Sequence, residues 1–325
     1  MIEGPTVFAG IDEAGLGPLL GPFCVGWCVI AAPRGTTDLW STLQEAVVRT
    51  PAAGDDRLVV DDSKRVHSGS RLGRARLEAT ALAFLRASGR PGASLLDLTD
   101  SPPGALAPSS PLDSDQPWYS AAAGLPEHAG EETLGRQEEA LARALETQRC
   151  SVLEAAVRVV GEAELNASFA STQNKAASIW SWVGPLVVSL FERFGERHLH
   201  LTLDRQGGRR RYGALVAAEL PFAEVRVRRE DREQALLEVR EGARRMTLLV
   251  RPRAEDTSLP VAVGSCLAKQ AREAAMEAFN RWFLEHQPGL SPTKGYVQDG
   301  RRWLAEAGPA LRAAGVERAS LERTR

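Results

Sequence analysis

The sequence predicts an α/β fold, because short apolar strands alternate with longer helices and several strands run directly into carboxylates. The clearest two strands are residues 7–11 and 199–204, which lead to Asp12 and Asp204 and then into glycine-containing turns. Buried strands repeat with a period of two residues and helices with a period near 3.6. Open α/β sheets place their sites at the carboxyl ends of strands. The same pattern therefore predicts both the fold class and the position of a site.

The first strand ends in two adjacent carboxylates, Asp12 and Glu13, followed by a glycine-rich turn. Because successive strand side chains point to opposite faces, we expect only one of the pair to face inward. Gly15 and Gly17 flank Leu16 and allow the backbone to approach a ligand closely, since no Cβ stands in the way. Taken alone, the pattern also fits a solvated turn with two surface acids.

The later elements follow from periodicity and turn residues. Further strands are expected at residues 22–31, 151–160 and 223–229, with a hairpin at 235–252 that turns near Gly242. Helices are expected at residues 38–49, 74–85, 131–147, 175–194, 265–285 and 301–314. Residues 89–130 are rich in Pro, Gly and Ser without a sustained period, so we expect a long loop or a partly disordered insertion there.

The composition of the chain limits the classes of protein to which it can belong. The chain has 325 residues, 43% hydrophobic and 25% charged, with a formal net charge of −2, so it can bury a full core. Without an overall basic excess, a nucleic-acid-binding surface has to be a local patch. The sequence has no apolar run long enough to cross a bilayer and no leader pattern, so we expect a cytoplasmic protein that does not associate with membranes.

The cysteines, histidines and lysines indicate which kinds of site the chain can form. The four cysteines show no CxxC pairing, which is typical of buried free thiols in a reducing compartment, and the histidines lack zinc-site spacing. The basic residues are almost all arginine. A lysine retained in such a chain is a candidate for a site that needs a compact ammonium. The four lysines are Lys64, Lys175, Lys269 and Lys294.

The string GIDEAGLGPLLGP at residues 10–22 resembles the N-terminal signature of the type 2 ribonucleases H (ribonuclease HII), in which a first strand ends in DEAGRG. Leu16 stands where that family usually carries Arg. Shorter segments resemble later family motifs in the same order, and the Thr and His that usually follow the last of them are replaced. These segments are DDSK at residues 61–64, Asp204 at a strand end, SCLAK at 265–269 and KGY at 294–296.

The resemblance implies a ribonuclease H-like fold: a mixed five-stranded sheet flanked by helices, with a C-terminal helical portion. It further implies one ribonuclease H-like domain over residues 1–325. Within this domain we expect the insertion at 89–130, an inserted hairpin at 235–252 and the C-terminal helical portion at 265–325.

The resemblance also implies four acids that are catalytic residues and metal ligands. Asp12, Glu13 and Asp204 match the first three positions. For the fourth acid, the spacing to the following proline selects Asp256 and the distance to the next motif selects Glu255. We favour Asp256, with Glu255 as the alternative and Asp231 as a more distant third.

Clustered carboxylates repel one another, and a divalent cation offsets that cost. Oxygen-only ligands favour Mg²⁺ or Mn²⁺ over zinc. Two such ions about 4 Å apart can activate a water for in-line attack on a phosphodiester, leaving 5′-phosphate and 3′-hydroxyl ends. The resemblance thus implies an endonuclease that hydrolyses the RNA strand of RNA/DNA hybrids, or ribonucleotides embedded in duplex DNA.

The resemblance further implies how the substrate is held. The backbone of the glycine turn would meet the 2′-hydroxyl, which separates RNA from DNA, and Tyr296 would pack against the nucleotide at an RNA–DNA junction. The expected substrate-binding residues are Gly15, Leu16, Gly17, Lys64, Lys269, Lys294 and Tyr296. Two alternatives stay open: a relative that binds hybrids without cutting them, and a ribonuclease H-like nuclease that acts on DNA junctions.

Overall fold

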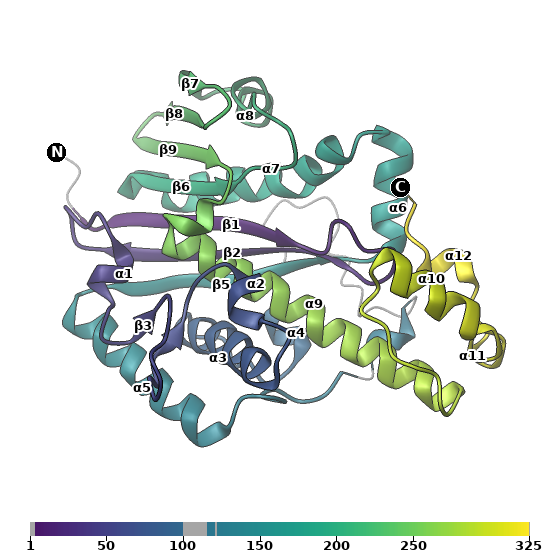
Figure 1. Cartoon of the computed structure of the whole chain (residues 1–325). Helices are drawn as coiled ribbons and strands as arrows, with labels where there is room; N and C mark the ends of the chain where they lie inside the picture. The colour runs from purple at the N-terminus through teal and green to yellow at the C-terminus, as the bar shows by residue number, and fades with distance from the viewer. Residues whose placement is uncertain (1–3, 100–115, 121, 325) are drawn as a thin grey trace.

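The computed structural model describes residues 4–99, 116–120 and 122–324, so part of the predicted insertion, residues 100–115 and 121, lies outside the described residues. A mixed sheet forms its centre (Figure 1). Its strands are β1 (Thr6–Ala14), β2 (Phe23–Ala32), β5 (Ser151–Val160), β6 (Leu199–Asp204), β7 (Glu224–Glu230), β8 (Ala235–Glu241) and β9 (Arg244–Arg251). Their order across the sheet is β5-β2-β1-β6-β9-β8-β7.

Neighbouring strands run in both directions. β2 pairs antiparallel with β1 and β5, whereas β6 pairs parallel with β1 and β9. These strands make the mixed five-stranded sheet that the resemblance implies. Helices flank it and further helices follow at the C-terminal side, which confirms the predicted fold class. The antiparallel strands β8 and β7 extend the sheet beyond β9, so it has seven strands rather than five.

Helices cover both faces of the sheet (Figure 1). On one face, α3 (Arg71–Ala87), α5 (Glu131–Thr147) and α9 (Leu259–His286) pack around one apolar cluster. On the other face, α7 (Lys175–Phe194) and α8 (Gly213–Glu219) pack around a second. Side chains of β2 alternate between the two clusters, because a strand presents successive residues to opposite faces.

The remaining elements are short or lie at the sheet's periphery. Between β2 and β5 these are α1 (Leu39–Thr42), β3 (Val47–Val48), β4 (Leu58–Val59), α2 (Ser63–His67), α4 (Leu95–Leu98) and the 3-10 turn η1 (Pro117–Tyr119). Those after β5 are α6 (Glu162–Thr172), η2 (Gly195–Arg197), η3 (Ala254–Asp256), α10 (Val297–Glu306), α11 (Gly308–Ala314) and α12 (Arg318–Leu321).

Two expected helices differ from the structure. The helix expected over residues 38–49 is only α1, because the valines that follow it form β3 and pair in parallel with β4. The helix expected over residues 301–314 is divided into α10 and α11, with Pro309 in the first turn of α11. Proline fits a first helical turn but disrupts a helix interior, which explains the break.

The described residues include neither a membrane-spanning helix nor a disulfide-bonded cysteine. No helix within the described residues is long and apolar enough to cross a membrane. The four cysteines are free and buried, as the sequence predicts.

Trp118 and Tyr119, which belong to the predicted insertion, are buried against the main body. These two aromatic side chains thus anchor the predicted insertion on the main body.

Three glycines allow α9 to lie directly against the sheet. A Cβ on Gly10 would lie 2.1 Å from the backbone nitrogen of Val261, and a Cβ on Gly26 would lie 2.1 Å from the carbonyl oxygen of Gly264. Both distances are far below van der Waals contact, so only glycine fits. This close packing of α9 on β1 and β2 brings Ser265 beside the carboxyl end of β1, in the same cavity lining as Asp12.

Gly26→Ala should therefore lower the free energy of unfolding by about 1–3 kcal/mol, the usual cost of overpacking a core. Gly135 in α5 is the matched control, because no described atom lies within 4 Å of its Cβ position. Gly135→Ala should raise the free energy of unfolding by about 0.5–1 kcal/mol, since alanine favours a helix interior. Urea denaturation of both variants measures this, and equal effects would contradict the close packing.

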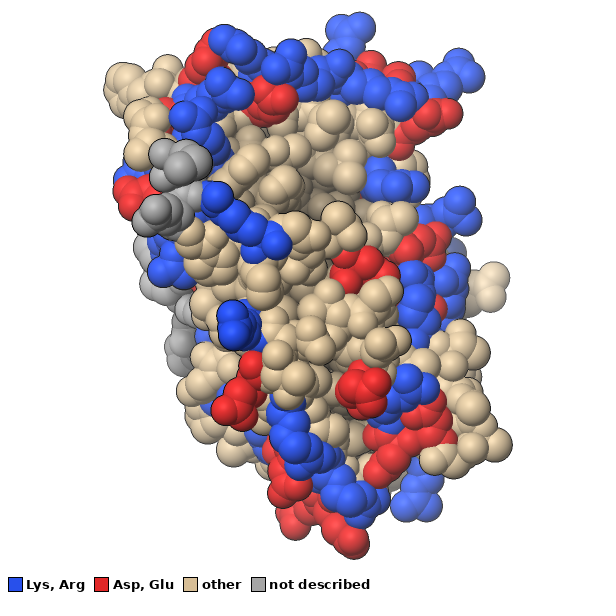
Figure 2. Space-filling view, turned by 90° about the vertical axis from the view of Figure 1, so that its left-hand side faces the viewer, with Lys and Arg blue, Asp and Glu red and all other residues tan. Residues whose placement is uncertain are grey.

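The free edge of the sheet at β7 is strongly charged. Figure 2 shows Lys and Arg side chains gathered along the top of the molecule, where β7 lies in Figure 1. Arg226, Arg228 and Arg229 on β7 are exposed, and they pair with neighbouring carboxylates such as Glu224 and Glu238. Charged side chains on an edge strand hinder pairing with other chains.

Candidate active site

A cavity of about 320 Å³ opens where β1 and β6 end side by side. Its lining combines carboxylates with a glycine-rich stretch of backbone. The acidic lining residues are Asp12, Glu13, Asp62, Asp204 and Glu255. Three of the four predicted acids thus come together, from strands that are far apart in the sequence.

Asp12 and Glu13 both line this cavity, whereas the sequence predicts that only one of them faces inward. The cavity lies at the end of the strand, so residues of both faces reach it. Burial raises the pKa of Asp12 well above its usual value, and the nearby Asp204 adds to this; the neighbouring Ser265 side chain acts in the opposite direction. Burial, again with Asp204, raises the pKa of Glu13 to about 7.

Asp204 and Glu255 form the other side of the acidic cluster. The backbone amide of Ala254 donates to Asp204 Oδ1 at 3.1 Å. Burial raises the pKa of Asp204, and this hydrogen bond partly counteracts it. Burial also raises the pKa of Glu255, with a further contribution from Asp204. Glu255 is 9% exposed, and its Oε2 atom is buried without a hydrogen-bond partner among the described residues.

Asp256, the favoured fourth acid, lies outside the lining of the cavity. Glu255 and Asp256 are adjacent residues of the 3-10 turn η3, but only the Glu255 side chain lines the cavity. The Asp256 side chain is bound by arginines instead. Arg65 Nη1 lies 3.0 Å from Asp256 Oδ1, and Arg49 Nη1 donates to the Asp256 carbonyl oxygen at 2.7 Å. Asp231 is also outside, in an exposed turn where backbone amides and Arg229 lower its pKa to about 2. Glu255 is therefore the acid that η3 contributes to the cavity.

Most of the predicted substrate-binding residues lie in the same cavity. Those lining it are Gly15, Leu16, Gly17, Lys64, Lys269 and Tyr296. Tyr296 is 51% exposed, so its ring is open to solvent at the cavity. Lys269 Nζ pairs with Glu273 at 2.5 Å. Lys294 is not among the lining residues and contributes to a neighbouring cavity instead.

Besides Ala14 and Pro18, four polar or charged lining residues were not predicted as site residues: Asp62, Ser63, Ser265 and Arg272. The Ser265 hydroxyl donates a hydrogen bond to the Ser63 hydroxyl at 3.0 Å, and the Ser265 side chain lowers the pKa of the neighbouring Asp12. Asp62 caps α2 by accepting a hydrogen bond from the Lys64 amide at 2.9 Å. Asp62, Ser63 and Ser265 lie within the motifs that contain Lys64 and Lys269, which is the signal that could have identified them, whereas Arg272 lies three residues beyond Lys269.

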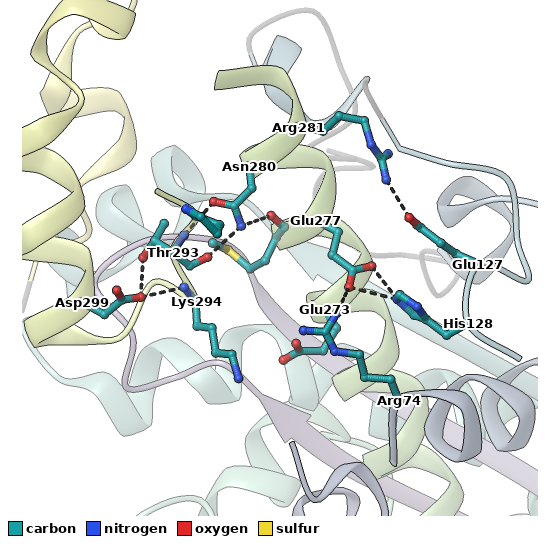
Figure 3. Close-up of a pocket in the computed structure, with 12 residues that line it drawn as sticks. Arg74, Glu127, His128, Glu273, Glu277, Asn280, Arg281, Thr293, Lys294 and Asp299 are labelled. Carbon is teal, nitrogen blue, oxygen red and sulfur yellow. Dashed lines mark hydrogen bonds and ion pairs between the residues drawn. The ribbon is translucent and has the colours of Figure 1, made fainter. Parts of the chain in front are cut away.

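The neighbouring cavity, of about 580 Å³, lies along α9 and contains Lys294 (Figure 3). Glu127, His128 and Glu277 lie close enough there to share a cation. However, Arg74 pairs with Glu277 at 2.9 Å, and Arg281 pairs with Glu127 at 2.8 Å. A divalent cation would compete with both arginines, so we assign no metal to this cavity.

This chain is only weakly similar to known proteins. Neither a protein-family model nor a curated protein matches the sequence. Among solved structures, the chain is similar to one from the complex of PCNA and ribonuclease HII of Archaeoglobus fulgidus, with 15% identity and a TM-score of 0.41, over 98% of this chain and 94% of that chain. For ribonuclease H2 of Pyrococcus horikoshii the identity is 15% and the TM-score 0.38, over 97% and 92%.

A third similar structure is Bst-RNase HIII in complex with Mn²⁺, with 15% identity and a TM-score of 0.42, over 98% of this chain and 66% of that chain. At these identities and TM-scores, the likenesses assign no chemistry to this chain. Its function has to be inferred from its own residues.

The raised pKa of Glu13 predicts a pH dependence of stability for the metal-free protein. Between the usual value of 4.5 and the raised value of about 7, the folded state keeps a proton that the unfolded state releases. The free energy of unfolding should therefore fall as the pH rises through this window, by at most about 3 kcal/mol. Thermal denaturation in chelator at pH 5–8 measures this.

Glu13→Gln provides the control for that prediction, because glutamine does not ionise. The variant should show a flatter pH dependence than the wild type in chelator. Added Mg²⁺ or Mn²⁺ should flatten the wild-type profile too, since a cation favours the ionised carboxylates. Identical pH profiles for the wild type and Glu13→Gln would contradict the prediction.

Proposed function

We propose that this chain is a metal-dependent endonuclease of the ribonuclease H type. It would hydrolyse the RNA strand of RNA/DNA hybrids, or ribonucleotides embedded in duplex DNA. The observation that carries the proposal is that Asp12, Glu13, Asp204 and Glu255 line one cavity together with the backbone of residues 15–17. The sequence motif supports the first three acids, and the geometry favours Glu255 over Asp256 as the fourth.

The acidic cluster fits Mg²⁺ or Mn²⁺. Its donors are carboxylate oxygens, which these hard cations prefer. Burial raises the pKa of all four acids, so a cation would offset an existing electrostatic cost. The unpartnered Glu255 Oε2 is a free ligand atom among the described residues. When bound, a pair of such ions supplies an activated water and stabilises the leaving 3′-oxygen.

Other residues of the cavity would orient the acids and select the substrate. The Glu13 amide donates a hydrogen bond to Asp12 Oδ1 at 2.7 Å and orients its carboxylate, with Ser265 in the same cavity lining. The backbone around Leu16 would meet the ribose 2′-hydroxyl. The exposed ring of Tyr296 would stack on a nucleotide, an interaction that tolerates any base. Cleavage would then depend on a ribose at the scissile position.

Cleavage of labelled duplexes tests the proposal. The panel is an RNA/DNA hybrid, DNA with one embedded ribonucleotide, and plain DNA, each with Mg²⁺ or Mn²⁺ and with an Asp12→Asn control. We expect cutting 5′ to a ribonucleotide, with a 5′-phosphate product and no cutting of plain DNA. Cutting of DNA regardless of the 2′-hydroxyl would favour the junction nuclease. Binding without cutting of any duplex would favour the non-catalytic relative.

A further inference from the structure

Residues 15–21, here called the glycine loop, are held on their buried side by an arginine 308 residues further along the chain. Arg323 Nη1 donates to the carbonyl oxygens of Gly15, at 2.5 Å, and Gly21, at 3.3 Å. Its Nη2 donates to the Leu16 carbonyl oxygen at 2.9 Å. Arg323 is 3% exposed. One guanidinium thus binds both ends of the glycine loop.

Two further buried charges contact the same loop. Arg272, 2% exposed, donates from Nη2 to the carbonyl oxygens of Leu20, at 3.4 Å, and Lys294, at 3.0 Å. Glu162 is fully buried and accepts a hydrogen bond from the Gly21 amide at 3.1 Å. These contacts fix the loop relative to the segment that carries Tyr296.

Glu162 also connects the loop to the predicted insertion. Tyr119 donates its hydroxyl hydrogen to Glu162 Oε1 at 2.8 Å, and Gln116 Nε2 donates to Oε2 at 2.7 Å. Burial lowers the pKa of Arg323 to about 10, with Arg272 adding to the shift and Glu162 opposing it. A buried guanidinium is costly to desolvate, so its hydrogen bonds to the loop must offset that cost.

The hydrogen bonds of these buried charges to the glycine loop come from residues distant in the sequence. Leu16 packs against the apolar cluster on the α7 side of the sheet and has no charged group. Removing the Arg323 guanidinium would leave the carbonyl oxygens of Gly15, Leu16 and Gly21 without that donor. Buried unpaired carbonyls are unfavourable, so the loop would shift.

We propose that Arg323 is the positioning residue of the glycine loop and thereby sets its discrimination between ribose and deoxyribose. It binds the loop carbonyls from the buried side, while Gly15, Leu16 and Gly17 line the cavity on the other. The role of Arg323 in discriminating ribose from deoxyribose rests on the proposed function, whereas its role in ordering the glycine loop does not.

Amide hydrogen exchange tests the positioning without any substrate. The variants are Arg323→Met, Arg323→Lys and the control Arg318→Met, whose side chain in α12 is 56% exposed and pairs with Glu322. Arg323→Met should speed exchange in residues 15–22 by about tenfold or more, with β5 unchanged. Arg323→Lys should give a smaller increase, because lysine keeps the charge but not the planar fork. If Arg323→Met does not fold, Arg323→Lys alone tests the positioning role.

Unchanged loop exchange in both Arg323 variants would overturn the positioning role, as would an equal increase in Arg318→Met. An increase spread over the whole protein in Arg323→Lys would also overturn it, because that pattern reflects a general loss of stability. These outcomes do not depend on catalysis. They therefore separate a failure of this inference from a failure of the proposed function.

Cleavage kinetics test the effect on specificity. The readout is the ratio of Ki for plain DNA, added as an uncut competitor, to KM for DNA with one ribonucleotide, and neither constant depends on the folded fraction. Arg323→Met should lower this ratio by about tenfold, through KM for the ribonucleotide substrate, and Arg323→Lys should partly restore it. A ratio unchanged from wild type would overturn the specificity role. A wild type that cuts neither duplex would instead overturn the proposed function, leaving the exchange result as the test of positioning.

Discussion

Asp12→Asn should reduce cleavage of ribonucleotide-containing duplexes by about three orders of magnitude or more, since metal-ion catalysis supplies several kcal/mol of transition-state stabilisation. Asp12 belongs to the acidic cluster that lines the cavity, where the charge of Asp204 contributes to its raised pKa. Asparagine keeps an oxygen that can accept the Glu13 amide hydrogen bond at the same position. The loss should therefore come from the missing charge and not from a disturbed strand.

Stability measurements distinguish this cause from misfolding. In chelator, Asp12→Asn should unfold at the same or a higher temperature than the wild type, because a buried repulsion is removed. With Mn²⁺ added, the wild type should gain stability through ligand binding and the variant should gain much less. A variant that loses activity together with its metal-free stability would contradict the assignment of Asp12 as a metal ligand.

Glu255→Gln should reduce cleavage by about a hundredfold or more, whereas Asp256→Asn should stay within about threefold of wild type. Even outer-shell partners of a metal typically contribute 10–100-fold, and Glu255 faces the cavity directly. Asp256 is occupied by Arg49 and Arg65 outside the lining. Its substitution should instead lower the free energy of unfolding by about 1 kcal/mol, as for partly exposed ion pairs.

The two substitutions are matched, because each replaces one carboxylate by its amide in adjacent residues of η3. Steady-state cleavage of DNA with one embedded ribonucleotide, together with thermal denaturation, measures both effects. The reverse pattern, with Asp256→Asn inactive and Glu255→Gln active, would restore the choice that the motif spacing favours.

Much of the fold could be predicted from local sequence patterns. The alternating leucines of residues 199–204 and the apolar run at 7–11 lie in β6 and β1, because strand periodicity depends on neighbouring residues only. The sequence could not show that residues 47–48 would pair with residues 58–59 rather than continue a helix. That choice depends on a tertiary contact, which overrides local propensity.

The site could be predicted only as far as its residues belong to motifs. Asp12 and Asp204 are marked by strand ends and glycines, but Glu255 and Asp256 are adjacent acids that only the direction of η3 distinguishes. That direction is coupled to Arg49 and Arg65, which come from distant segments. Arg323 carried no signal at all, because its partners are backbone carbonyls of the glycine loop.

The contact between Arg323 and the glycine loop has a consequence for biosynthesis. β1 and β2 are neighbours in sequence and can pair early, but the loop between them lacks its guanidinium donor until residue 323 has emerged from the ribosome. Domains generally fold as units from the N-terminal side during translation, and contacts between distant residues form late. The nascent chain would thus carry its acidic cluster with an incompletely ordered loop. The glycine loop would become fully ordered only after Arg323 has been synthesised and has reached it.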